Sequence, residues 1–207
     1  VSVGSQVMHM LTVMIVGLAM GTTVTIGQAV GAKNRKKISQ TIGNTVILFC
    51  IVSVAMMAFF LCMVRPIVAV MSTPAEAVEG TVEYLTICFV GIPCITAYNV
   101  ISSIFRGMGD SKSPMYFIAI ACGANIAFDY IFMGALHLGP AGAALGTTLA
   151  QALSVVIALT VILKKKMGIS VSRQDFRPRR EATGQIVRIG LPIALQDGLI
   201  QVAFIII

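Results

Sequence analysis

Long stretches without a charged side chain constrain this 207-residue chain more than any other feature. Residues 1–32, 38–64 and 84–105 carry no formal charge, and residues 113–163 carry only one, on Asp129. A helix needs about 20 apolar residues to cross the hydrocarbon of a bilayer, and each run reaches that length. The polar-apolar alternation of barrel strands is absent, so the runs predict helices. The chain is therefore predicted to be an all-α polytopic membrane protein.

Loops and helix-breaking residues divide the chain into six candidate spans: 10–30, 41–64, 84–105, 115–136, 141–163 and 186 onward. We expect these spans to form one six-helix bundle. Pro93 and Pro192 fall inside spans and predict kinks. Small residues four apart let helices approach closely, and such pairs occur at Gly17 and Gly21, Gly27 and Gly31, and Gly142 and Gly146.

The basic residues are distributed unevenly between the connections. Alternate connections, after the first, third and fifth spans, hold 14 of the 15 Lys and Arg residues, and Arg65 alone lies on the other side. By the positive-inside rule those three connections are cytoplasmic. The net charge of +7 is explained by this topology, so we expect the lipid bilayer, and not nucleic acid, as the partner of the basic loops.

The cysteines and histidines are not spaced as in metal or redox centres. The five cysteines lie inside apolar runs and form no CxxC pair, and the two histidines stand alone. We interpret the cysteines as small apolar residues within the bundle. No cofactor is expected.

Asp129 is a candidate functional residue because an acid in the middle of a membrane costs about 2.5–3.5 kcal/mol to insert. Asn125 is four residues earlier and therefore projects from the same helix face. On the returning span, Thr147 lies roughly 9 Å below the outer end and Gln151 roughly 15 Å, which matches roughly 10 Å for Asp129 and 16 Å for Asn125. Oxygens converging at one depth could hold a small cation or a proton. The competing interpretation is that Asp129 fixes the packing of two helices by a hydrogen bond.

Two further groups of polar residues lie inside predicted spans. Asp197 is the second intramembrane acid, and either a cavity or a helix-packing contact would explain it. The third span carries Thr96, Tyr98, Asn99, Ser102 and Ser103. Cavity lining and ordinary bonding between helices are equally consistent with these residues, and we take Tyr98 and Asn99 as candidate cavity-lining residues together with Gln151 and Asp197.

Three segments in order resemble the multidrug and toxic compound extrusion (MATE) transporters. The loop from Arg106 to Pro114, RGMGDSKSP, resembles the family's RGxGD(S/T)xxP connection. The sequences NIAFDY at 125–130 and GPAGAALGT at 139–147 are similar to the segments that follow it in the family.

The resemblance implies two six-helix lobes, with residues 1–181 covering the second to sixth helices of the N-terminal lobe and 182–207 beginning the C-terminal lobe. The first helix and most of the second lobe would lie outside this sequence. A cation site of some family members carries over to Asn125, Asp129 and Thr147, with Na⁺ or H⁺ as the coupling ion. The acid that members carry on the first helix has no counterpart here. A Glu that some members carry in the seventh helix falls at Ile200, so a second site is not expected.

The leading hypothesis is therefore a cation-coupled antiporter, not an enzyme, that exports amphipathic and often cationic organic compounds without an obligate protein partner. A lipid or oligosaccharide flippase of related fold is an alternative, but it would be expected to carry Arg or Lys deep in its spans to hold phosphate. A remote alternative is an intramembrane aspartyl protease, because residues 107–110 match a GxGD motif. Asp110 lies between Arg106 and Lys112 in a predicted cytoplasmic loop, which argues against this assignment.

Overall fold

The computed structural model describes residues 2–70, 78–165 and 180–206, and these residues contain helices and no strand. The all-α prediction is confirmed. The helices are α1 (Ser2–Gly31), α2 (Arg35–Val70), α3 (Val78–Val90), α4 (Ile92–Gly107), α5 (Lys112–Asp129), the π-helix η2 (Tyr130–Ala135), α6 (Gly139–Lys165) and α7 (Arg180–Ile206).

Five of the six predicted spans appear as helices long and apolar enough to cross a membrane. Four are continuous, and the fifth is the pair of α3 and α4, which are bent by 43° at Gly91. The bend confirms the kink predicted near Pro93, which lies in the first turn of α4. The sixth span forms the helix α7, which runs through Pro192 but is not among these candidates within the described residues.

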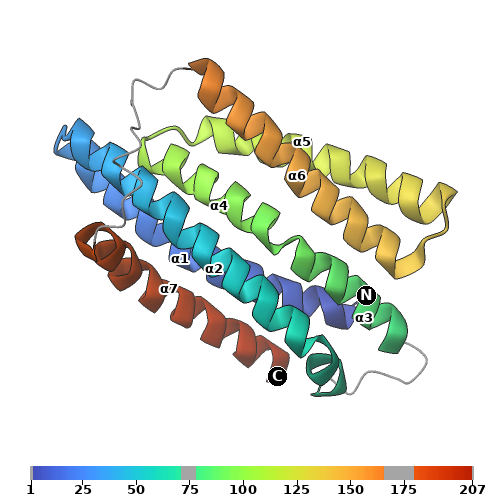
Figure 1. Ribbon diagram of the computed structural model, residues 1–207. Coiled ribbons are helices and arrows are strands. Elements are labelled where there is room, and N and C mark those ends of the chain that lie inside the picture. Colours follow the sequence, from blue (N-terminus) through green and yellow to red (C-terminus); the bar gives the residue numbers. More distant parts are fainter. Residues whose placement is uncertain (1, 71–77, 166–179, 207) are drawn as a thin grey trace.

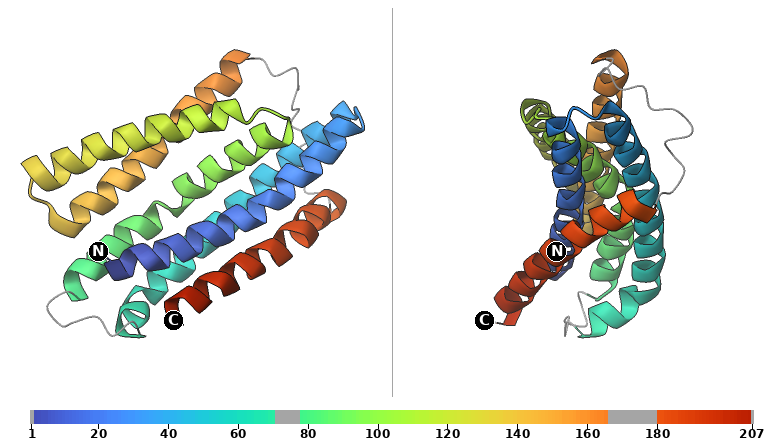
Figure 2. Two further views of the ribbon diagram at one scale, coloured as in Figure 1. Left: turned by 180° about the vertical axis from the view of Figure 1, so that it is seen from behind. Right: turned by 90° about the vertical axis from the view of Figure 1, so that its left-hand side faces the viewer.

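The helices are arranged so that α5–α6 and α7 lie at opposite edges of the bundle (Figures 1 and 2). Helix α4 lies between these edges, and most of its side chains are buried. Within the described residues, α7 contacts only α1 and α2, and α5 contacts only α6, η2 and α4. The two intramembrane acids therefore belong to different parts of the fold, since Asp129 ends α5 and Asp197 lies on α7.

The packing of α1 on α7 depends on small residues. A Cβ added at Gly17 would come within 2.7 Å of Ala194 Cα, and one added at Gly21 would overlap the backbone oxygen of Ile186. A Cβ at Gly190 would overlap the backbone oxygen of Leu18. The close approach predicted from Gly17 and Gly21 is confirmed. Gly31, by contrast, has nothing near its Cβ position.

The basic connections gather at one end of the bundle. The turns between α1 and α2 and between α4 and α5 lie there, together with the beginning of α7 (Figure 1). The geometry agrees with the predicted alternation of the connections, and the assignment of this end to the cytoplasm stays a prediction. Most of the basic loop between α6 and α7, at 166–179, lies outside the described residues.

Candidate functional site

Asp129 lies where the regular winding of its helix ends. It is the last residue of α5, and the next six residues form the π-helix η2. Short π-helical segments are rare and are frequently found at functional sites. The π-helix begins at Tyr130, directly after Asp129, which is the only acidic residue in the α5–α6 hairpin.

Asn125 and Thr147 bring the two helices of the hairpin together beside Asp129. The Asn125 amide donates to Thr147 Oγ1 at 3.3 Å, and the Thr147 hydroxyl donates to the Ala143 backbone oxygen at 3.0 Å. Because the Asn125 side chain donates through its nitrogen, its carbonyl oxygen is left as the group that could face a cation. Asn125, Asp129 and Thr147 thus lie on two adjacent helices, as predicted.

Gly146 makes room for the carboxylate. Oδ1 of Asp129 is shielded from solvent and has no hydrogen-bond partner among the described residues. It lies against α6 at the point where a Cβ on residue 146 would overlap it. An alanine there would displace the carboxylate, so the glycine at this position is part of the site.

A cavity of about 170 Å³ adjoins this group and continues along α5 toward the end that carries Lys112. Its polar lining consists of Asn125 and Cys122 from α5, Thr147 and Gln151 from α6, and Tyr98 from α4. Of the four predicted cavity-lining residues, Tyr98 and Gln151 are therefore brought together with Asn125 and Thr147.

The other two predicted lining residues lie elsewhere. The Asn99 amide donates to the Ile95 backbone oxygen of its own helix at 2.8 Å, and Asn99 does not line this cavity. Asp197 lies on α7, which contacts neither α5 nor α6 within the described residues. Its neighbour Gly198 faces Met14 of α1, so Asp197 belongs to the α1–α7 side of the bundle.

Tyr84 is a buried polar residue on the Asp129 side of the bundle that the sequence did not reveal. It lies on α3, and its hydroxyl is 3.3 Å from that of Ser5 on α1. A tyrosine at the start of a span is typical of the membrane interface, and no sequence spacing connects it with α5. Only the packing of α3 against α6 places it here.

Asp110 has a structural role at the start of α5. Its carboxylate accepts hydrogen bonds from the backbone N–H groups of Lys112 and Ser113 and from the Ser113 hydroxyl. Gly109, with φ of 86°, provides the left-handed turn that places the carboxylate there. The GxGD sequence is therefore explained as a helix cap, a role that needs no second acid.

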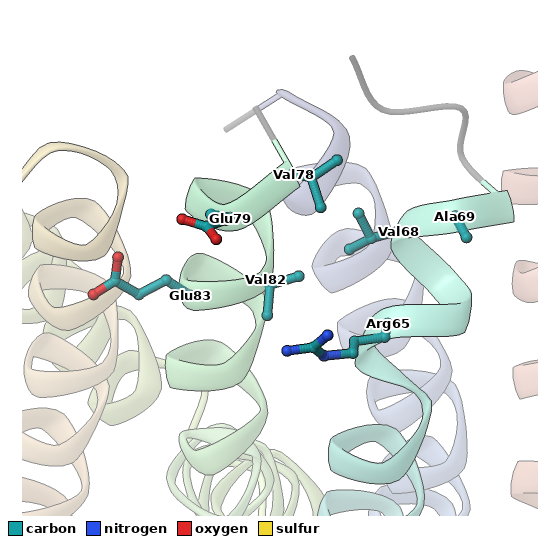
Figure 3. Close-up of a pocket in the computed structure, with 7 residues that line it drawn as sticks. All are labelled: Arg65, Val68, Ala69, Val78, Glu79, Val82 and Glu83. Atoms are coloured by element: carbon teal, nitrogen blue, oxygen red, sulfur yellow. The ribbon is translucent and has the colours of Figure 1, made fainter. Parts of the chain in front are cut away.

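A separate cavity, of about 600 Å³, lies between the end of α2 and the beginning of α3 and contains none of the predicted site residues. Figure 3 shows Arg65 extending from α2 toward Val82, while Glu79 and Glu83 point to the opposite side of α3. All three charged residues line this cavity, but the two acids do not point at the guanidinium of Arg65. Among the described residues, no group of three or more His, Cys, Asp or Glu could hold a metal ion.

Helices that can cross a bilayer, with a partly buried carboxylate between two of them, define a multi-pass helical membrane protein with an intramembrane polar site. The chain belongs to the MatE family, whose model matches residues 1–131. This membership confirms the resemblance found in the sequence motifs.

Curated relatives and solved structures agree with the assignment. The chain is 30% identical to "Probable multidrug resistance protein YpnP" of Bacillus subtilis, over 94% of this chain and 43% of the relative. It is 28% identical to "Probable multidrug resistance protein NorM" of Thermotoga maritima, over 95% and 43%. Two solved structures of a multidrug resistance MATE family transporter, one inward-facing and one outward-facing, match with TM-scores of 0.90 and 0.89. Both are 28% identical to this chain and cover 96% of it, and the match covers 45% and 44% of their own chains. The chain thus spans less than half the length of these relatives.

Proposed function

We propose that residues 1–181 form most of the N-terminal lobe, and 182–207 the beginning of the C-terminal lobe, of a cation-coupled antiporter that exports amphipathic organic compounds. Nearly all of this chain matches these relatives, but the match covers less than half of each relative, which supports this division. The word multidrug in their names supports an organic substrate.

The observation that carries the proposal is the environment of Asp129. One carboxylate oxygen lies without a partner against Gly146, and the Asn125–Thr147 pair is one helical turn away. One negative charge with neutral oxygens suits Na⁺, whose hard oxygen ligands these groups supply, or a proton on the carboxylate. Desolvation favours the neutral acid and a bound cation favours the carboxylate, so the site has the two charge states that coupling requires.

Coupling also requires that ion and substrate bind differently to the inward-open and outward-open states. The chain resembles an inward-facing and an outward-facing relative equally well. This likeness supports a chain segment that moves largely as a unit between the two states. In this proposal the ion at Asp129 alters how the lobe packs against its partner lobe.

The flippase alternative finds no support in the cavity. A phosphate-bearing substrate would need basic side chains within the membrane, and neither Lys nor Arg lines the 170 Å³ cavity. Arg65 lies near the end of α2, at the far side of the bundle from that cavity.

The test is dye efflux from vesicles that contain the full-length protein, with Na⁺ and pH gradients imposed separately. We expect efflux under one gradient, which identifies the coupling ion, and loss of that efflux in Asp129→Asn, which keeps the shape of the side chain and removes its charge. Gradient-driven efflux that is unchanged in Asp129→Asn would contradict the mechanism.

A further inference from the structure

A cavity of about 390 Å³ lies at the basic end of the bundle, between the beginning of α2 and the beginning of α7. The turn before α2 and the start of α7 lie at the same end of the molecule in Figure 1. Polar side chains line both walls of this α2–α7 cavity: Asn34, Lys36, Lys37, Gln40 and Thr41 on the α2 side, and Glu181 and Gln185 on the α7 side. None of them belongs to the α5–α6 hairpin, so the cavity is separate from the site at Asp129.

Each wall of the α2–α7 cavity is held by its own hydrogen bonds. On the α2 side, Asn34 Oδ1 accepts from the Lys37 backbone N–H at 3.0 Å, and the Thr41 hydroxyl donates to the Lys37 backbone oxygen at 2.8 Å. On the α7 side, the Gln185 amide donates to the Gln28 side-chain oxygen of α1 at 3.0 Å. These bonds fix the two walls without crossing the cavity.

The two walls carry opposite charges that do not pair with each other. Lys36 and Lys37 are positive, Glu181 is negative, and all three side chains are exposed. Within the described part of the chain, neither lysine forms an ion pair with Glu181. Both α2 and α7 begin at this cavity, and a helix N-terminus adds about half a positive charge. The cavity as a whole is therefore positive, with a single carboxylate on one wall.

These charges favour a ligand that carries charges of both signs. A phosphate group beside the two lysines would accept charge-assisted hydrogen bonds, and an ammonium group on the same ligand would donate to Glu181. An anion without an ammonium group would leave the carboxylate facing a like charge, and a simple cation would face two lysines. Such juxtapositions of like charge are unfavourable, so a zwitterion fits this cavity best.

The size and position of the cavity indicate where such a ligand comes from. A volume of about 390 Å³ falls within the roughly 300–1,000 Å³ of small-molecule sites. Basic residues beside membrane spans lie at the level of the lipid headgroups, and both walls are helix ends of this kind, since α2 begins with Arg35 and α7 with Arg180. The bilayer itself therefore presents phosphate and ammonium groups to this cavity.

We propose that the α2–α7 cavity binds the headgroup of a zwitterionic phospholipid that has a primary ammonium group, such as phosphatidylethanolamine. Lys36 and Lys37 hold the phosphate, and Glu181 holds the ammonium group. The headgroup thus joins the beginning of α2 to the beginning of α7 through charges that the protein leaves unpaired across the cavity. This inference goes beyond the proposed function and does not depend on it.

The test is native mass spectrometry of the full-length protein with phosphatidylethanolamine, phosphatidylcholine and phosphatidylglycerol of identical acyl chains. Phosphatidylcholine has a quaternary ammonium group with no N–H to donate, and phosphatidylglycerol has the phosphate without the ammonium group. We expect phosphatidylethanolamine to bind about threefold more tightly than either, the effect of one exposed ion pair. Equal binding of the three lipids would overturn the proposal.

Substitutions on the two walls should act differently. Lys36→Gln combined with Lys37→Gln should weaken binding of phosphatidylethanolamine and phosphatidylglycerol alike, about tenfold, because both lipids carry the phosphate. Glu181→Gln should abolish the preference for phosphatidylethanolamine over phosphatidylglycerol without weakening the binding of phosphatidylglycerol. A merely structural role of Glu181 would weaken all three lipids together, and that result would contradict the assignment of the ammonium group.

Lys33→Gln combined with Lys112→Gln is the matched control, because it removes the same charge from the same end of the bundle at residues that do not line the cavity. Lipid affinity should stay within about twofold of wild type. A loss equal to that of the Lys36 and Lys37 variant would show a general attraction of lipid to the basic end and would overturn the site.

Soluble glycerophosphoethanolamine distinguishes a lipid from a free ligand of the same chemistry. Added at the lipid's concentration, it should not displace phosphatidylethanolamine, because it lacks the acyl chains that hold the headgroup at the membrane surface. Displacement would overturn the assignment to a lipid. None of these measurements requires transport, so their outcome is independent of the efflux test of the proposed function.

Discussion

The two edges of this bundle use polar and small residues in opposite ways. Where α1 meets α7, glycines allow backbone to approach backbone, and a Cβ at Gly21 or Gly190 would strike main-chain atoms. Where α5 meets α6, Gly146 instead admits a carboxylate, and polar side chains of both helices line a cavity. Within a membrane, close backbone contact stabilises packing, whereas unpartnered polar groups are costly and mark function. The same residue type thus indicates packing at one edge and a site at the other.

The largest effect on stability is expected where backbones touch. Gly190→Ala should lower the stability of the full-length protein by about 3 kcal/mol, the upper end for overpacking, because the Leu18 backbone cannot move aside as a side chain would. Gly184→Ala on the same helix meets nothing within 4 Å and should be neutral or stabilising by up to about 1 kcal/mol. Thermal unfolding in detergent measures both. Equal shifts in Tm would show that the α1–α7 contact is looser than described.

Gly146→Ala should affect ion binding more than folding. The added methyl group overlaps Asp129 Oδ1, and the carboxylate must rotate away, so we expect about a tenfold loss of ion affinity, equivalent to about 1.4 kcal/mol. Gly123→Ala on α5 is the control, since nothing lies within 4 Å of its Cβ position. Ion titration of both variants would reveal the difference. An unchanged affinity in Gly146→Ala would show that Asp129 does not bind the ion.

Thr147→Val tests one neutral oxygen of the site. It removes the acceptor of the Asn125 amide and should weaken ion binding about fivefold, which corresponds to about 1 kcal/mol for one hydrogen bond. Thr160→Val removes a hydroxyl that makes the same kind of bond to its own helix, to Val156. The same titration should find Thr160→Val indistinguishable from wild type. If both variants lose affinity equally, the effect comes from the helix and not from the site.

The smallest effect is expected from Ser154→Ala. The Ser154 hydroxyl donates across the hairpin to the Phe117 backbone oxygen at 3.1 Å, and such bonds between membrane helices average about 0.6 kcal/mol. Ser53→Ala, whose hydroxyl bonds to Cys50 of its own helix, should have less effect. Thermal unfolding measures the loss of stability in both variants. A larger loss in Ser53→Ala would show that the hairpin does not depend on the Ser154–Phe117 hydrogen bond.

Much of the hairpin could be predicted from sequence because its geometry is local. Helical spacing places Asn125 and Asp129 on one face, and a short connection forces the next span to return beside them. The depth estimate nevertheless set Asn125 opposite Gln151, whereas the structure pairs it with Thr147. The difference arises because α6 begins at Gly139, earlier than the predicted 141, and the end of the preceding span winds as a π-helix.

Contacts between distant segments could not be predicted in the same way. Tyr84 meets Ser5 only through the packing of α3 beside α1, and the contact of α1 with α7 joins residues more than 160 positions apart in sequence, such as Gly21 and Gly190. Periodicity reports which face of a helix is polar or small, but not which helix will cover that face. For that reason the sequence left Asp197 equally open to a cavity or a packing contact, and the structure places it at the edge opposite Asp129.

The two intramembrane acids provide the most direct measurement. The full-length protein in detergent would be tested for ²²Na⁺ binding and for proton uptake or release on addition of an organic cation, as wild type, Asp129→Asn and Asp197→Asn. We expect the ion signal of the wild type to disappear in Asp129→Asn and to remain in Asp197→Asn. Persistence in Asp129→Asn, or loss in Asp197→Asn alone, would contradict the assignment of the ion site to the α5–α6 hairpin.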